Sequence, residues 1–380
     1  MWGDCLLITP IILGGTIVKE MKRMVKKEYW YLNILLWVLM IFSLIGLAGC
    51  SSNEITDDRQ EDIQAKNIVI EDYSSEIDSW GTDTMVIGTV NHGIRREEIE
   101  ELERDGYITY RGEEMKIPYK ALATGKATNL GFLLFIDGRP QAYSIDDFEE
   151  YTYCHVFEME EDVEKSFDFC FSPSVGEKGK IQELTILSIY YPNFIPDMKQ
   201  TSSYGMYHQT LEVACDIKME ANPLINEKQM ITDGMLNNIF VDEMEITQDY
   251  LMGPIIQQYG MQEITQEALD NNIFNLVLFE GEYYTDNYLL TSDSFKITFE
   301  MCGKDGTEYY VTPYINHVPV CDAQLVTVRK GKVSSLTYNF DIAALDNFQT
   351  FYFIAIPINN ENFLQIKTSS ILLYKEEKSQ

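Results

Sequence analysis

Residues 135–140 are Phe-Ile-Asp-Gly-Arg-Pro, and residues 314–319 are Tyr-Ile-Asn-His-Val-Pro. Both stretches have an aromatic residue, an isoleucine, an Asp or Asn and a proline at the same steps. Because Asp and Asn tolerate left-handed backbone and form local turn hydrogen bonds, each stretch predicts a strand that ends in a bend. Proline has no backbone donor, so Pro140 and Pro319 should lie in the turn or at a strand edge.

Further matches follow in the same order along the chain, which indicates an internal duplication. The offset in residue number between matched residues becomes smaller along the chain, because the loops of the second half are shorter. The strand-like blocks themselves stay aligned. One such match could arise by chance, but several in one order are hard to explain that way. The matched pairs are Lys116-Ile117 with Lys296-Ile297, 167–171 with 336–340, 184–189 with 351–356, and 201–203 plus Tyr207 with 368–370 plus Tyr374.

The matched blocks have the pattern of β-strands. Apolar and polar residues alternate over 295–301 and 336–340, as in half-buried strands. Asp305-Gly306 lies between two such runs and predicts a hairpin turn. Short strands separated by turns predict antiparallel sandwiches. We therefore expect a mostly β chain with two tandem, internally duplicated immunoglobulin-like β-sandwich domains, at 67–220 and 221–376.

Only a few short helices are expected. Arg95 to Arg104 is rich in charged residues and predicts an exposed helix that Gly106 would end. A second helical stretch is expected from Gln248 to Ala268, with an interruption at Gly253-Pro254. The acid-rich runs, such as 97–103 and 158–164, are expected to be solvated faces.

The N-terminal stretch has the layout of an export signal. Basic residues gather within 19–27, and an uncharged apolar run follows over 31–49. The run ends in Leu47-Ala48-Gly49-Cys50, followed at once by polar residues. These four residues resemble the lipobox of a bacterial lipoprotein signal peptide. A plain transmembrane anchor is the alternative for an apolar run of this length.

The resemblance implies cleavage between Gly49 and Cys50 and a diacylglyceryl group on the Cys50 thiol. Residues 1–49 would then be the signal peptide, and 50–66 the lipidated cysteine with an acidic tether too polar to fold. Two acyl chains are enough for stable anchoring, so the partner is the membrane, and the body lies on the extracytoplasmic face of the bacterial cell membrane. Residues 1–20 precede the usual start of such a leader, and we expect them to be an artefact of the assigned start codon.

Charge and composition limit the function. The net charge of −31, with 29 lysines and arginines among 380 residues, argues against a nucleic-acid partner, because phosphate binding needs clustered basic residues. No catalytic motif stands out, so we expect no enzymatic activity and no cofactor. No metal site is expected either, because none of the histidines has a second ligand at the usual spacing; they are His92, His155, His208 and His317.

The cysteines after Cys50 give no clear disulfide framework. Five of them remain, and no cysteine pair recurs in both halves of the duplication. Burial as small apolar residues is the simpler interpretation. If one intrachain bridge exists, Cys154–Cys170 is the pair we favour.

The function with most support is a membrane-anchored, non-enzymatic lipoprotein for binding, adhesion or assembly, with an unidentified protein or glycan as partner. A carbohydrate- or solute-binding lipoprotein that serves a transporter is the alternative, although two-lobed receptors of that kind alternate strands and helices. An enzyme such as a cell-wall hydrolase comes third.

Overall fold

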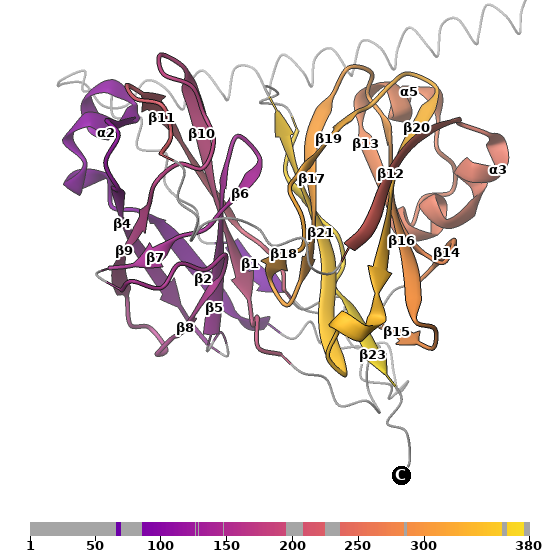
Figure 1. The fold of residues 1–380 in the computed structure, drawn as a ribbon, viewed down its shortest axis with the longest axis horizontal. Coiled ribbons are helices and arrows are strands. Elements are labelled where there is room, and N and C mark those ends of the chain that lie inside the picture. The colour runs from indigo at the N-terminus through magenta and orange to yellow at the C-terminus, as the bar shows by residue number, and fades with distance from the viewer. Residues whose placement is uncertain are drawn as a thin grey trace, which may run out of the picture. The chain divides into compact units, whose positions relative to one another are not determined.

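The computed structural model describes the chain mainly beyond residue 85 (Figure 1). The leader, Cys50 and nearly all of the predicted tether lie outside the described residues, as does the matched block at 201–203. Residues 62–380 form one compact unit. None of the described helices is long and apolar enough to cross a membrane. The described residues are 66–69, 86–125, 127, 129–146, 148–194, 208–224, 236–284, 287–358 and 363–375.

Two sheets form a first sandwich, in the strand orders β1-β2-β4-β9-β7 and β3-β11-β10-β5-β6, with β8 paired to β5. All pairings are antiparallel except that of β3 with β11. The strands are β1 (Lys66–Val69), β2 (Val86–Ile94), β3 (Tyr107–Tyr110), β4 (Met115–Ala123), β5 (Asn129–Ile136), β6 (Arg139–Gln141), β7 (Ser144–Ile145), β8 (His155–Glu158), β9 (Lys165–Phe171), β10 (Ile181–Tyr190) and β11 (Glu212–Met219).

Two more sheets form a second sandwich, in the orders β12-β20-β16-β13-β14 and β15-β23-β21-β17-β18, with β19 on β17 and β22 on β21. Here β15 and β23 are the parallel pair. The strands are β12 (Leu236–Glu245), β13 (Ile273–Phe279), β14 (Glu282–Tyr283), β15 (Asn287–Leu290), β16 (Ser294–Gly303), β17 (Glu308–Ile315), β18 (Val318–Pro319), β19 (Gln324–Thr327), β20 (Lys332–Asp341), β21 (Phe348–Ile358), β22 (Ile366–Lys367) and β23 (Ile371–Lys375).

The strand orders confirm the predicted immunoglobulin-like sandwiches. In the first, β2-β4-β9-β7 matches the A-B-E-D sheet of an immunoglobulin domain and β5-β10-β11 matches C-F-G. In the second, β13-β16-β20 and β17-β21-β23 occupy the same places. The strand at the position of immunoglobulin strand D differs between the two sandwiches. In the second sandwich it is β12, which comes before all the other strands of that sandwich in the sequence.

The duplication holds at the level of single residue pairs. Phe169 lies opposite Ile117 in the first sandwich, and Tyr338 lies opposite Ile297 in the second. These are the residues that the sequence matches aligned. Phe169 and Tyr338 are fully buried, one in each of two separate hydrophobic cores, so each half of the chain folds around its own core.

The two matched turns also have the same geometry. Asp137 and Gly138 have φ of 45° and 73°, and Asn316 and His317 have 49° and 66°, so both hairpins have left-handed backbone at both central residues. The Asp137 carboxylate accepts a hydrogen bond from the Glu183 backbone N–H at 2.8 Å. The Asn316 side chain accepts the equivalent bond from Thr350 at 2.9 Å.

The prolines lie where the sequence predicts. Pro140 in β6 pairs with Phe135, and Pro319 in β18 pairs with Tyr314. Both β6 and β18 are short strands at the edge of their sheets, where a residue without a backbone donor interrupts no central ladder. The shared proline is therefore a structural part of the repeat.

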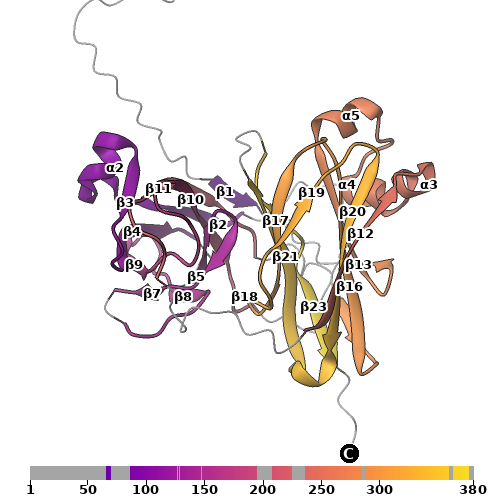
Figure 2. The ribbon, with the colours of Figure 1, turned by 45° about the horizontal axis from the view of Figure 1, so that its top comes forward.

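The predicted helices are present, with the expected breaks. Residues 95–104 form η1 (Arg96–Glu98) and α2 (Glu100–Asp105), and Gly106 ends α2 with a φ of 78°. In Figure 2 the second helical stretch lies against the second sandwich. It comprises α3 (Gln248–Tyr250), the π-type turn η4 (Leu251–Ile255), α4 (Ile256–Tyr259) and α5 (Gln266–Asn271), and the chain is non-helical at Gly253.

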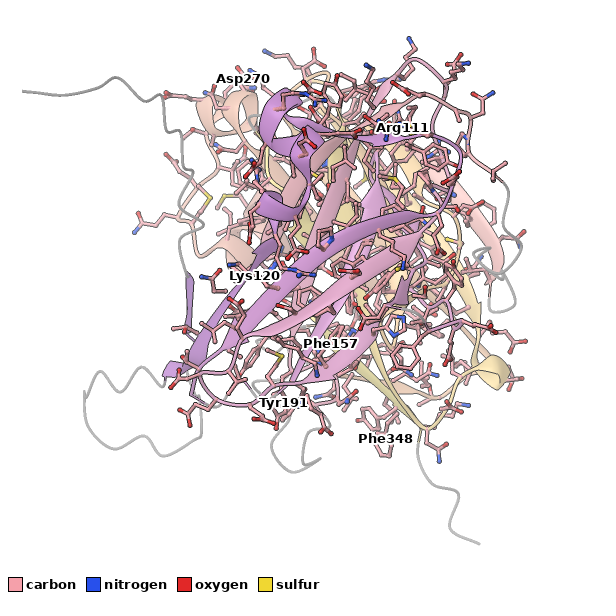
Figure 3. All side chains as sticks on the ribbon, turned by 90° about the vertical axis from the view of Figure 1, so that its left-hand side faces the viewer. Arg111, Lys120, Phe157, Tyr191, Asp270 and Phe348 are labelled. Carbon is pink, nitrogen blue, oxygen red and sulfur yellow. The ribbon has the colours of Figure 1, made fainter. Side chains whose placement is uncertain are left out.

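The charged surface agrees with the sequence, and the five cysteines after Cys50 are free thiols, as the simpler interpretation predicts. Figure 3 shows the side chains with the first sandwich facing the viewer. Arg111 pairs with Glu101, and most of the acidic side chains in the two predicted runs are exposed. Cys154 and Cys170 are free thiols. The pair named for a possible bridge is therefore not bonded: Cys170 lies on β9, while Cys154 lies outside the strands and packs against Gly131 of β5.

The matched hairpins lead to a first prediction. Asp137→Ala and Asn316→Ala should each destabilise the chain by about 1–2 kcal/mol, because each loses a turn hydrogen bond and places alanine at positive φ. Asp137→Asn is the control and should change the free energy of unfolding little, since the other repeat uses Asn there. Urea denaturation measures all three variants. Equal losses for Asp137→Ala and Asp137→Asn would contradict the assigned role of the turn.

Candidate functional site

The outer faces of two sheets pack against each other inside the compact unit. The faces belong to the β5–β10 pair of the first sandwich and the β17–β21 pair of the second, and we call them the contact faces. Their side chains form one cluster in which each is at most 2% exposed. It consists of Leu133, Phe135, Leu187 and Ile189 from the first sandwich and Tyr314, Tyr352, Ile354 and Ile356 from the second.

Equivalent positions of the repeat meet in this cluster. Phe135 and Tyr314 are matched residues, and their ring centroids are 6.3 Å apart in an edge-on arrangement. Ile189 and Ile356 are matched residues as well, and both belong to the cluster. An interface in which a surface packs on its own counterpart is the kind found in two-fold symmetric homodimers. Here both partners belong to one chain.

The two matched hairpins lie at opposite ends of the contact faces. At one end, a Cβ added to Gly138 would come within 3.2 Å of Cβ of Ile356 and of Tyr310, so only glycine fits there without a shift. At the other end, His317 occupies the equivalent step and presents a full side chain. Its Nε2–H donates to the Pro192 carbonyl at 2.8 Å, and its Nδ1 lies 2.9 Å from the Tyr352 hydroxyl.

The end that holds His317 is a buried basic cluster. The rings of His208 and His317 are 5.0 Å apart. His208 Nδ1 lies 2.9 Å from the Ser370 hydroxyl, so the first sandwich also contacts the second through this residue. The Lys367 ammonium lies 4.3 Å from the centre of the Tyr352 ring and donates to the Ser370 hydroxyl at 3.1 Å.

Burial makes the charged forms of these three side chains costly. It lowers the pKa of His317 to about 4 and the pKa of Lys367 to about 7. The pKa of His208 falls well below its usual value, first because of burial and then because His317 and Lys367 are close. At neutral pH the two histidines are therefore neutral and serve as hydrogen-bonding groups of the interface.

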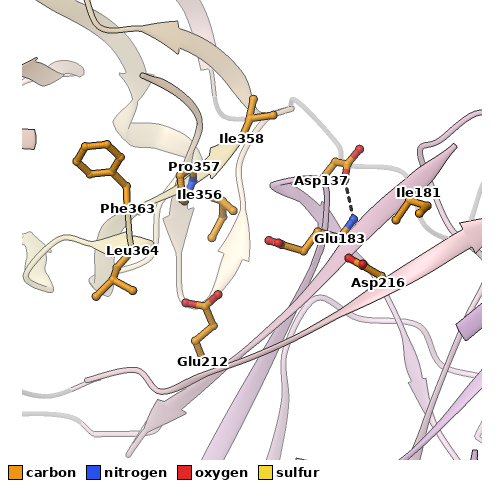
Figure 4. A pocket seen from close by; sticks show the side chains of 10 residues that line it. All are labelled: Asp137, Ile181, Glu183, Glu212, Asp216, Ile356, Pro357, Ile358, Phe363 and Leu364. Atoms are coloured by element: carbon orange, nitrogen blue, oxygen red, sulfur yellow. Dashed lines mark hydrogen bonds between the residues drawn. The ribbon is translucent and has the colours of Figure 1, made fainter. Parts of the chain in front are cut away.

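The end that holds Gly138 contains a cavity of about 680 Å³, shown in Figure 4. The first sandwich lines it with carboxylates and the second lines it with apolar side chains. No lysine or arginine is among the lining residues that the structure describes. The lining comprises Asp137, Ile181, Glu183, Glu212 and Asp216 from the first sandwich and Ile356, Pro357, Ile358, Phe363 and Leu364 from the second.

The carboxylates of the cavity are electrostatically unfavourable to one another. Partial burial and the neighbouring Glu183 carboxylate raise the pKa of Glu212 to about 7. Burial also raises the pKa of Asp137, against the attraction of Arg139. Arg139 itself points to the second sandwich, where it donates to the Tyr310 hydroxyl at 2.7 Å and lies over that ring. The cavity is therefore lined by carboxyls whose ionisation is costly, and Glu212 is only partly ionised at neutral pH.

A second buried carboxyl lies under the helices of the second sandwich. Glu300 on β16 is 6% exposed and its Oε2 has no hydrogen-bond partner among the described residues. Helical residues such as Leu251, Ile255 and Leu269 cover this part of the sheet in a small apolar core of their own. Burial raises the pKa of Glu300, and the nearby Tyr250 hydroxyl opposes that effect. Glu300 therefore belongs to the packing between the sheet and the helices that cover it.

The residues predicted from sequence fall outside this region. Cys50 and Gly49, the predicted lipid attachment and cleavage positions, lie outside the described residues. Within the described ranges no group of three or more His, Cys, Asp or Glu side chains is placed to hold a metal ion. His92 instead lies within 2.5 Å of the Tyr119 hydroxyl in the first core, and His155 Nε2 lies 3.0 Å from the Tyr143 carbonyl.

Sequence reasoning missed the contact faces, although a signal was present. Strands buried on both faces have continuous apolar runs rather than alternating ones. Residues 132–136 and 351–356 are such runs, and both belong to the contact faces. The Gly138-for-His317 difference is visible at a matched step of the repeat. Its meaning depends on knowing that both hairpins lie at the same interface.

Comparisons with known proteins add little. No family model matches the sequence, and no curated protein matches it. Three similar solved structures are a protein of unknown function from Porphyromonas gingivalis W83, the CsuC–CsuE chaperone–tip adhesion subunit complex of Acinetobacter baumannii Csu pili, and the C-terminal domain of the Streptococcus agalactiae polypeptide BspA.

Their identities to this chain are 8%, 9% and 7%, and their TM-scores are 0.19, 0.15 and 0.17. The alignments cover 70%, 71% and 77% of this chain and 96%, 95% and 97% of the matched chains. Likeness at this level carries no conclusion about function. The fold assignment depends on the strand pairing described above.

The low pKa of His317 predicts an acid-sensitive contribution to stability. In the unfolded chain the histidine gains a proton near its usual pKa of about 6.5, while in the folded chain it stays neutral down to about 4. Its contribution is therefore present above pH 6.5 and lost as the pH falls towards 4. Between pH 7.5 and pH 5 the loss should be about 2 kcal/mol.

His317→Asn tests this, because asparagine also tolerates left-handed backbone. Urea denaturation at pH 7.5 and pH 5 should show a smaller difference between the two pH values for the variant than for the parent chain. The surface carboxylates are the same in both proteins, so their contribution to the pH dependence of the unfolding free energy cancels in this comparison. The same pH dependence in both proteins would rule out a buried neutral His317.

Glu300 gives the opposite pH dependence. A carboxyl whose folded pKa is raised supports the fold at low pH, and that support is lost as the pH rises through the folded value. Glu300→Gln should therefore become more stable relative to the parent as the pH rises from 4.5 to 8. Glu103→Gln, on the exposed surface of α2, is the control and should show no such trend. A relative stability of Glu300→Gln that does not change with pH would show that Glu300 is charged in the folded chain.

Proposed function

We propose that the chain is an exported lipoprotein, anchored by Cys50 to the outer face of a bacterial cytoplasmic membrane, with a non-enzymatic role in binding, adhesion or assembly. The observation that carries the proposal is the sequence Leu47-Ala48-Gly49-Cys50 at the end of an apolar run that follows a basic patch. The acidic tether would hold the body away from the anionic lipid surface.

The body supports a binding role in two ways. Immunoglobulin-like sandwiches are common in proteins that recognise other molecules outside the cell, although such a fold by itself does not determine function. The packed contact faces bring two sandwiches together in one compact unit, so residues from both line a common cavity. A site built from two packed elements is suited to binding because its walls are held in place on both sides.

Capture of a small solute for a transporter is the second candidate. The cavity of about 680 Å³ lies within the range of small-molecule sites, and that single observation favours the candidate. It has less support than a macromolecular partner, because two-lobed receptors close over a solute by a hinge motion, whereas these two sandwiches are packed together through buried side chains. A permease gene next to the coding sequence would favour the transporter role.

Replacing the lipobox cysteine tests the anchor. Cys50→Ser should abolish labelling by a radioactive fatty acid and leave the leader uncleaved, because a hydroxyl does not replace the thiol that accepts the lipid. Labelling and fractionation of bacterial membranes measure both effects. Cys154→Ser is the matched control and should be labelled and processed as the parent is, since Cys154 packs in the body. A mature, membrane-retained Cys50→Ser protein would contradict the proposed anchor.

A further inference from the structure

One edge of the second sandwich lacks the protection that the other described sheet edges have. Strand β12 ends its sheet beside β20, and within the described part of the chain no strand pairs with its other side (Figure 1). It has 10 residues, whereas the other edge strands that the structure describes have two to four. Two of those short strands, β6 and β18, also contain proline. Shortness and proline prevent an edge from pairing with other chains, and β12 has neither.

The side chains of β12 are exposed and apolar at its centre. Phe240, Val241 and Met244 are 55%, 68% and 41% exposed. The strand nevertheless belongs to the sandwich, because Leu236 and Ile239 pack against its core and β12 pairs with β20. Exposed apolar side chains on an ordered, unprotected edge are typical of a surface that another strand covers.

The acidic side chains of β12 do little to protect this edge. Charged side chains usually oppose pairing at an edge. Here a Glu243 carboxylate oxygen lies 3.1 Å from an Arg329 guanidinium nitrogen, and Glu245 pairs with Lys332 of β20. Both carboxylates are therefore partly neutralised from within their own sandwich. The third acid, Asp242, accepts a hydrogen bond from the backbone N–H of Glu243 at 2.8 Å.

The order of apolar and polar residues in β12 is the same in both directions from Phe240. Residues 236–244 are Leu-Asn-Asn-Ile-Phe-Val-Asp-Glu-Met. When two copies pair antiparallel about Phe240, each apolar residue lies opposite an apolar residue and each polar residue opposite a polar one. Directly opposed side chains are the contacts that stabilise a strand pair. The opposed pairs include Phe240 with Phe240, Ile239 with Val241, Leu236 with Met244, and Asn238 with Asp242.

Charge favours antiparallel over parallel pairing of two such strands. Parallel pairing in register would also place apolar residues beside apolar ones, but it would place Asp242 beside Asp242 and Glu243 beside Glu243. Like charges at neighbouring positions destabilise a strand pair. In the antiparallel pair the Asp242 carboxylate faces the Asn238 amide, which can donate a hydrogen bond to it. Antiparallel pairing therefore separates the acids of the two copies.

We propose that β12 is a self-association edge, through which two copies of this chain pair antiparallel with Phe240 of each copy at the two-fold axis. The pairing joins the two sheets that end in β12 into one continuous sheet. Such an isologous contact is closed, so it gives a dimer in which neither copy of this edge stays free. The inference goes beyond the binding role proposed above, and it depends on neither the Cys50 anchor nor a ligand in the cavity.

Analytical ultracentrifugation tests the pairing with the chain from residue 51 onward, which contains the whole compact unit. The parent chain should form a concentration-dependent dimer. Phe240→Lys and Phe240→Glu should each weaken dimerisation by about tenfold or more, because like charges then meet at the axis. An equimolar mixture of these two variants should recover a heterodimer, since opposite charges then face each other. Val163→Lys replaces an exposed apolar residue of the first sandwich and should dimerise as the parent does.

Cysteine cross-linking tests the register. Asn238→Cys and Asp242→Cys chains should cross-link when they are mixed under mild oxidation, because these positions oppose each other across the axis. Neither variant should cross-link with itself, since identical positions then lie roughly 13 Å apart along the strands, too far for a disulfide. The parent chain gives the background from its five other cysteines.

Four outcomes would overturn the proposal. A parent chain that stays monomeric at every concentration would leave β12 to a strand of another protein. Cross-linking of Asn238→Cys with itself, or none in the mixture, would exclude the antiparallel register. A mixture of the two Phe240 variants that associates no better than either alone would place Phe240 away from the axis. Equal weakening by Val163→Lys would assign dimerisation to a different surface. Circular dichroism confirms that each variant is folded, and none of these results bears on the labelling of Cys50.

Discussion

Burial of the two contact faces against each other is the constraint on which the arrangement of the body depends. An immunoglobulin-like sheet normally has one face in its own core and the other in water. Here β5, β10, β17 and β21 are apolar on both faces. Large apolar side chains such as Phe135 or Tyr352 would each lose roughly 1.5–3 kcal/mol if exposed, so neither sandwich can leave the other without a substantial cost. The pairing makes two domains behave as one unit.

The contact faces also explain why the two repeats have diverged where they did. A homodimer with a two-fold axis must place the same residue at both ends of its interface. Duplication within one chain removes that requirement. One hairpin keeps glycine and a cavity, while the other has His317 and a buried network with His208 and Lys367. The matched core residues Phe169 and Tyr338 are both aromatic, and each is buried in the core of its own sandwich.

Much of the fold could be predicted from the sequence, for reasons that particular residues illustrate. The period-two pattern identified β16 and β20, and the Asp137 and Asn316 turns fixed the hairpins, since both signals are local. The position of β12 in the sheet could not be predicted, because β12 pairs with β20, which lies far away in the sequence, and no local sequence pattern indicates that pairing. Spacing alone could not decide whether Cys154 and Cys170 are bonded. In the structure they are free thiols, with Cys170 on β9 and Cys154 packed against Gly131 of β5.

The candidate site was beyond sequence reasoning for a different reason. Its carboxylates are four among 60 acidic residues, and nothing in their spacing distinguishes them. Asp137, Glu183 and Asp216 come from different strands or turns, and the apolar wall comes from the other repeat. The lipobox is the reverse case. It is a contiguous signal that the sequence shows in full, and it concerns residues that the structure does not describe.

The asymmetry between Gly138 and His317 also has a consequence for stoichiometry. A true two-fold dimer of such sandwiches would carry two identical cavities, and occupation of one could alter the other. In this chain the matched positions at the two ends differ, with Asp137 and Glu183 at one end and Asn316 and Thr350 at the other, so the repeat does not duplicate the carboxylate-lined cavity. Several such sites can act together on one partner only when several molecules lie close to one another.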